Sequence, residues 1–171
     1  AFFIKLLLCL LLKMIFAYMD TNKLNFIKND FTSMAAGLKT EAAGKWGKMN
    51  AQQMAEHVAD FFKISTGKIK MPFVSSPEHL EKLKAFLYSD KEFRENTKAP
   101  VLPEEPFPVR HAVMQESVDE LKNEIDNFIA AFESQPGLIT QHPVFGDLNF
   151  DEWVMLHYKH VRHHAKQFGL V

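Results

Sequence analysis

The sequence predicts an all-α domain: a four-helix bundle with an extra short helix and a proline-rich loop. Apolar residues recur at spacings of three and four along four segments, as on one face of an amphipathic helix. No segment shows the alternation of a half-buried strand. With 171 residues, 47% of them apolar, the chain is large and hydrophobic enough for one globular domain.

The first expected helix covers residues 20–37. Its apolar positions are Leu24, Ile27, Phe31, Met34, Ala35 and Leu38. They form one stripe that would face the interior of a bundle. The segment that follows, residues 39–49, is mostly polar and carries two glycines, so we expect a connection there.

The second helix is expected over residues 51–66. Asn50 is placed to act as its N-cap, and Gln53 stands three residues later, the spacing of a capping box. Gly67 then ends the helix, because glycine readily adopts the conformation that terminates one.

Prolines mark the next two features. Pro77 opens an expected short helix over residues 77–89, at a position where its missing N–H costs no hydrogen bond. Residues 96–110 contain four prolines, which exclude a regular helix or a central strand. Loops of this length in compact domains often form lids or site walls, so we expect this one to border a pocket.

Capping signals also predict the last two long helices. Ser117 and Glu120 have capping-box spacing, which predicts a helix from there to Pro136. The segment 142–147 is then expected to be a loop, and no strands are expected. Asn149 should cap a final helix over residues 150–168, with Glu152 three residues later completing a capping box. The helical stripes predict a core of ten residues: Trp153, Leu156, Val161 and Phe168 packed against Met54, Val58, Phe61, Leu121, Ile125 and Phe128.

Composition excludes several classes of function. The chain has 20 Lys+Arg against 21 Asp+Glu, so it lacks the positive charge with which proteins neutralise nucleic-acid phosphates. Its one cysteine, Cys9, excludes an internal disulfide, a Cys-ligated zinc site and a CxxC redox motif. Any metal would have to be bound by His, Asp or Glu side chains.

Residues 1–18 differ sharply from the rest. They are almost wholly apolar, but two lysines interrupt them, which makes a poor signal peptide and a marginal membrane-spanning helix. We expect them to be upstream sequence translated in frame before a true start at Met19, with a signal or membrane anchor as the alternative. On either reading they contribute nothing to the bundle, whose domain is residues 19–171.

Histidines provide the candidate site. Four of the eight fall between residues 157 and 164 of the last helix. His160 and His164 are spaced i, i+4, so both rings can reach one ion, and His157 shares their apolar stripe. His57 lies on the apolar face of the helix over residues 51–66. Inward-facing histidines also pack without a ligand, so this pattern alone leaves both readings open.

The other histidines and nearby carboxylates have simpler expected roles. His163 falls at the edge of the stripe, as a boundary residue. We expect the remaining three to be solvated at the surface: His79, His111 and His142. Asp60, which flanks His57 together with Glu56, could orient a ring as an outer partner, but a solvated ion pair is the simpler expectation.

The stretch from His160 to Gln167, His-Val-Arg-His-His-Ala-Lys-Gln, together with His57 after Trp46-Gly-Lys-Met-Asn50, resembles the DinB-like superfamily of metal-binding four-helix bundles. The segments WGKMNAQQMAEH, ENTKAP and HPVFGDLNFDEW resemble a branch of unknown function, and the resemblance covers residues 19–171. It implies that His57, His160 and His164 bind a divalent ion. The family pattern does not require a histidine at position 157, so His157 is a candidate additional ligand.

Three neutral imidazoles suit Zn, Ni or Fe and leave a coordination position open. The resemblance implies a thiol-dependent transferase, using a low-molecular-weight thiol as cofactor, or a metal-assisted hydrolase. The alternative is a non-catalytic bundle with a structural or stress-response role. We expect a small-molecule substrate, no nucleic acid, and no membrane partner unless residues 1–18 are retained, and leave a homodimer open. The expected compartment is the cytoplasm, or an exported or anchored location if those residues are a signal.

Overall fold

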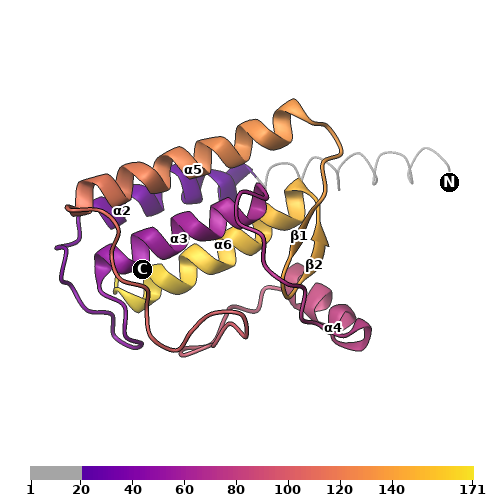
Figure 1. The fold of residues 1–171 in the computed structure, drawn as a ribbon, viewed down its shortest axis with the longest axis horizontal. Helices are drawn as coiled ribbons and strands as arrows, with labels where there is room; N and C mark the ends of the chain where they lie inside the picture. The colour runs from indigo at the N-terminus through magenta and orange to yellow at the C-terminus, as the bar shows by residue number, and fades with distance from the viewer. Residues whose placement is uncertain (1–20) are drawn as a thin grey trace, which may run out of the picture.

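The computed structural model describes residues 21–171 (Figure 1). The expectations for residues 1–18 and for the start at Met19 lie outside this range. In chain order the elements are η1 (Phe26–Phe31), α2 (Thr32–Ala36), α3 (Ala51–Ser65), α4 (Pro77–Tyr88), α5 (Met114–Ser134), β1 (Thr140–His142), β2 (Gly146–Leu148) and α6 (Phe150–Gln167). The fold is therefore mostly helical, as expected.

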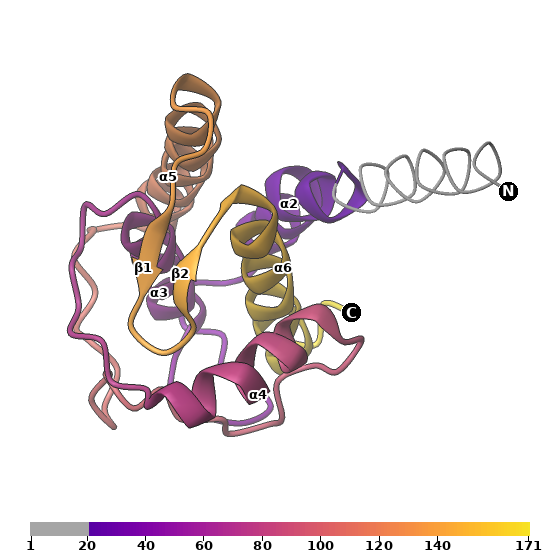
Figure 2. The ribbon, with the colours of Figure 1, turned by 90° about the vertical axis from the view of Figure 1, so that its right-hand side faces the viewer.

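Four helical segments pack side by side. The first is a single run in which the π-helical turn η1 continues directly into α2. It packs on α5 and α6, while α3 packs on both of these helices (Figure 1). Helix α4 lies outside this group, near the hairpin at the end of the molecule, where it contacts α6 (Figure 2).

Two predicted capping boxes are present. The backbone N–H of Gln53 donates to Asn50 Oδ1 over 2.8 Å, and the backbone N–H of Asn50 donates to Gln53 Oε1 over 3.0 Å. Asn149 and Glu152 exchange the same two bonds, each 3.0 Å long. These caps fix where α3 and α6 begin, and therefore which side chains each helix turns inward.

The prediction for the start of α5 was wrong. The helix begins at Met114, and Ser117 is buried inside it, where its hydroxyl donates to Glu56 Oε1 over 2.8 Å. The side chain that reaches back at this helix start is Glu116, which accepts from the Ala112 N–H. Ser117 thus serves as a donor to a buried carboxylate on another helix, which a local pattern does not reveal.

The expectation of no strands was also wrong. Strands β1 and β2 form an antiparallel hairpin, with Thr140 opposite Leu148 and His142 opposite Gly146. Each strand has three residues, too few to show alternation. His142, expected to be solvated, is 6% exposed because its Nδ1 accepts from the N–H groups of Val144 and Phe145 and so closes the turn.

The predicted core is largely confirmed. Eight of its ten residues are at most 1% exposed: Met54, Val58, Leu121, Ile125, Phe128, Trp153, Leu156 and Val161. Phe61 and Phe168 are only partly buried at its edge. Residues 96–110 form no helix or strand, as expected. Within residues 21–171, no helix is both long enough and apolar enough to cross a membrane.

Candidate metal centre

Three histidine side chains from two helices meet at one point. Nε2 of His160 on α6 lies 3.0 Å from Nε2 of His57 on α3 and 3.0 Å from Nε2 of His164, one turn further along α6. Ring nitrogens of all three lie within 4.8 Å of one another. The structure thus brings together the three histidines singled out in the sequence.

This meeting follows from the helix geometry. Positions 160 and 164 lie on one face of α6 because four residues are slightly more than one turn. His57 lies on the second turn after the Asn50 cap, and its ring makes edge contacts, at 5.0 Å between centroids, with both His160 and His164. The capping box therefore sets the rotation of α3 that turns His57 toward α6.

The three rings are neutral near pH 7. Burial lowers the pKa of His57 to about 4, although nearby Asp60 opposes the shift. Burial and the neighbouring histidines hold the pKa values of His160 and His164 well below 6.5. A neutral imidazole carries a lone pair on one nitrogen, which is the form that binds metals.

Gln167 determines which nitrogen of His164 carries the proton. The Gln167 Nε2 donates to the backbone carbonyl of Trp46 over 2.8 Å, so Oε1 is the atom that faces His164. Because an amide oxygen only accepts, the 2.8 Å contact to His164 Nδ1 requires a proton on that nitrogen. Nε2 of His164 therefore presents its lone pair toward His160.

His157 does not join this cluster. It is 0% exposed, and its ring stacks on Phe62 with 3.7 Å between centroids and 7° between planes. Neither of its ring nitrogens has a hydrogen-bond partner in the part of the chain that is described. The group of residues that could hold an ion contains only His57, His160 and His164 within that range.

The remaining histidines lie apart from the cluster. His79 is exposed, as expected, and lies 3.0 Å from the Ser76 hydroxyl. His111 is half-buried and lies 2.9 Å from a carboxylate oxygen of Glu120, rather than being freely solvated. His163 is half-buried beside Trp46, which agrees with its expected place at the boundary of the stripe.

Acidic side chains near His57 are engaged elsewhere. Asp60 forms 3.0 Å ion pairs with Lys63 and Arg110, so the ion-pair expectation is confirmed, although the residue is half-buried. Glu56 is buried and accepts from the Arg110 and His111 N–H groups as well as from Ser117. No local pattern indicates this structural role, because its donors lie more than fifty residues away. The potential metal ligands in the cluster are therefore all neutral nitrogen atoms.

Two of the three separations between these nitrogens are those expected of ligands on one ion. Nitrogens held about 2.1 Å from a metal lie about 3.0 Å apart at right angles and about 3.4 Å apart at the tetrahedral angle. The two separations of 3.0 Å match the lower end of this range. His164 is 5% exposed, whereas His57 and His160 are half-buried residues, so these two lie nearer the surface than His164 does.

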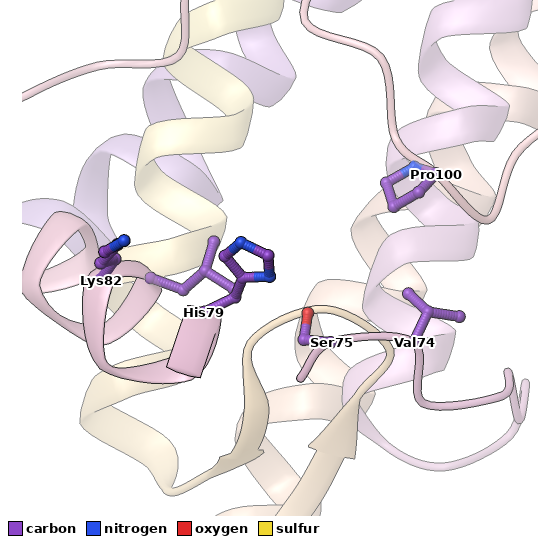
Figure 3. A pocket seen from close by; sticks show the side chains of 6 residues that line it. Val74, Ser75, His79, Lys82 and Pro100 are labelled. Atoms are coloured by element: carbon purple, nitrogen blue, oxygen red, sulfur yellow. The ribbon is translucent and has the colours of Figure 1, made fainter. Parts of the chain in front are cut away.

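Two hollows on the surface lie elsewhere. One, of about 370 Å³, lies between the start of α4 and the proline-rich loop and is lined by Val74, Ser75, His79, Lys82, Leu83 and Pro100 (Figure 3). The other, of about 380 Å³, is lined mainly by acidic residues of α5. Neither includes a histidine of the cluster. The loop nevertheless passes close to α3, because Gln53 Nε2, one turn before His57, donates to the Phe107 carbonyl over 3.1 Å.

Comparison with known proteins gives one match. A family model described as "Protein of unknown function (DUF1569)" matches residues 20–169. No curated protein and no solved structure matches the chain.

Proposed function

The chain belongs to the DUF1569 family, and we propose that it binds one divalent metal ion through His57, His160 and His164 and uses that ion in catalysis. In this proposal the protein is a DinB-like bundle that acts on a small molecule. The reaction is a thiol-dependent transfer or a metal-assisted hydrolysis. Zn, Ni and Fe are the candidate ions, because all three accept imidazole ligands.

One observation carries the proposal: three neutral imidazole nitrogens converge, and their cluster includes no carboxylate in the described chain. Neutral ligands leave the double positive charge of an ion uncompensated. The open position would therefore favour an anion, either hydroxide formed from water or the thiolate of a small thiol. The domain itself supplies no thiol, because the one cysteine of the chain, Cys9, lies before residue 19.

The residues of the chain have separable roles in this scheme. His57 and His160 would hold the ion on the side nearer the surface, and His164 would hold it from the more buried side. Gln167 keeps the Nε2 lone pair of His164 aimed at the site. A bound ion would supply Lewis acidity at its open position.

The partial exposure of His57 and His160 favours the enzyme over the structural alternative. A structural zinc site is usually closed by a fourth protein ligand. His157 was the candidate for that ligand, yet it is stacked on Phe62 and lies outside the group of three. An open position is what a substrate or thiol cofactor requires.

Cobalt substitution would test this proposal. Metal-free protein is loaded with one equivalent of Co²⁺, whose visible spectrum reports coordination, and a small thiol such as 2-mercaptoethanol is then added. An open three-histidine site should bind the thiolate and develop a sulfur-to-cobalt charge-transfer band in the near ultraviolet. Phe62→Leu, a change beside His157 but outside the cluster, is the matched control and should give the same band.

Two results would contradict the proposal. Failure of the protein to bind Co²⁺ would remove the metal site altogether. A cobalt spectrum that is unchanged by thiol, by azide and by pH between about 6 and 9 would show a closed site and favour the structural alternative.

A further inference from the structure

We propose that Gln167 is a positioning residue that couples the metal centre to the loop containing Gly44 and Gly47. This inference rests on the proposed metal site. It adds that metal affinity depends on residues of the loop that do not touch the ion.

The Gln167 side chain is buried, with the residue 5% exposed, and both ends of its amide are used. Oε1 accepts from His164 Nδ1–H over 2.8 Å, and Nε2 donates to the Trp46 carbonyl over 2.8 Å. The second bond fixes the orientation of the amide and hence selects the proton position on His164. By contrast, Nδ1 of His160 is buried without a partner in the described chain.

The loop is shaped around this side chain. The Lys45 N–H donates to the backbone carbonyl of Gln167 over 2.6 Å. A Cβ at Gly44 would lie 2.8 Å from Gln167 Cγ, and one at Gly47 would lie 2.6 Å from Gln167 Nε2. Gly47 also has φ +77°, a backbone conformation that residues with a side chain rarely adopt. Both glycines therefore leave the space that the Gln167 amide occupies.

The effect on metal binding follows from ligand chemistry. A hydrogen-bond acceptor on the outer nitrogen of a metal-bound histidine fixes its tautomer and increases its basicity, and loss of such a partner typically weakens metal affinity by about 10- to 100-fold. Displacing the Gln167 amide should have this effect even when every ligand is intact. The conformation of the loop thus affects metal affinity through its contacts with the Gln167 side chain.

Two substitutions at Gln167 separate positioning from packing. Gln167→Leu removes the acceptor and the donor, whereas Gln167→Glu keeps an acceptor for His164 and loses only the donor to Trp46. We expect Zn²⁺ affinity, measured with a competing chelator, to fall by about 10- to 100-fold in the first variant and by less than about threefold in the second. A purely structural role predicts equal losses, because the loop bond is missing in both.

A glycine pair provides the matched control. Gly47→Ala should weaken Zn²⁺ binding by about tenfold or more, because the new Cβ displaces the Gln167 amide. Gly67→Ala imposes the same backbone strain, at φ +73°, but its Cβ meets nothing within 4 Å. It should therefore leave the affinity unchanged, and thermal melts of both variants would show that they fold.

Nitrogen-15 NMR of the metal-free protein reads the tautomer directly. His164 should be protonated at Nδ1 in the wild type, and this preference should be lost in Gln167→Leu and kept in Gln167→Glu. Equal Zn²⁺ affinity in the wild type, Gln167→Leu and Gly47→Ala, or protonation of His164 at Nε2, would overturn the inference. Absence of Zn²⁺ binding in the wild type would instead overturn the proposed function, while the NMR result would still report on the Gln167 bond.

Discussion

Replacement of His157 tests the burial of this imidazole through the pH dependence of stability. The ring is 0% exposed, and burial, reinforced by His142, holds its pKa well below 6.5. In the unfolded chain the same group should titrate near its ordinary value of 6.5. Its folded-state pKa is thus depressed, so its contribution to stability is complete above 6.5 and is lost as the pH falls below that value.

The magnitude follows from linkage. At about pH 5.5, one unit below the unfolded-state value, the unfolded imidazole is about nine-tenths protonated while the folded one stays neutral. Protonation of this one group therefore stabilises the unfolded state by about 1.4 kcal/mol relative to pH 7.5. His157→Phe removes the group. Between pH 7.5 and 5.5, the free energy of unfolding of this variant should therefore decrease by a smaller amount than that of the wild type, and the two decreases should differ by about 1.4 kcal/mol.

Urea denaturation of metal-free protein at the two pH values measures this difference. Any change in packing caused by the new side chain is the same at both pH values and cancels. His157→Leu, which packs differently against Phe62, is the control and should give the same difference. Equal pH dependence in the wild type and both variants would refute the reasoning, because it would mean that folded His157 takes up a proton as readily as the unfolded chain does.

Other predictions concern stability and the domain boundary. Trp153→Ala should lower the free energy of unfolding by about 3–5 kcal/mol, because the side chain is fully buried in the core; a loss below about 1 kcal/mol would contradict that packing. Glu56→Ala should cost about 3 kcal/mol or more, since it leaves three donors without their acceptor, and Glu81→Ala at the exposed surface of α4 is the control for urea denaturation. A chain that begins at Met19 should fold with a melting temperature within a few degrees of the full sequence, and failure to fold would show that residues 1–18 are needed.

Local signals predicted most of the helices because the relevant physics is local. The caps at Asn50 and Asn149 involve residues three positions apart, and helical spacing alone put His57, His160 and His164 on inward faces. The spacing thus made the three histidines candidates, and the family resemblance implied that they share one site.

Features that depend on distant partners were not predicted. Ser117 resembled a cap but donates to Glu56, sixty-one positions earlier in the chain. His142 has no helical periodicity, and its burial results from the hairpin turn that it closes and from ring contacts with Phe61 on α3 and Trp153 on α6. The contact between Gln167 and Trp46 spans 121 positions, so no local pattern could show that the loop supports a site histidine.

Metal titration of histidine variants is the decisive test of the three-histidine site. Metal-free protein without a histidine tag is titrated with Zn²⁺ and Ni²⁺ by calorimetry. We predict one ion per chain and a loss of affinity of about 100-fold or more on replacing any ligand by Ala, because a coordinate bond and the geometry are lost together. Variants of His79, His157 and His163 should bind nearly as the wild type does. No binding by the wild type, or equal affinity across all the variants including His57→Ala and His160→Ala, would show that these histidines are packing residues.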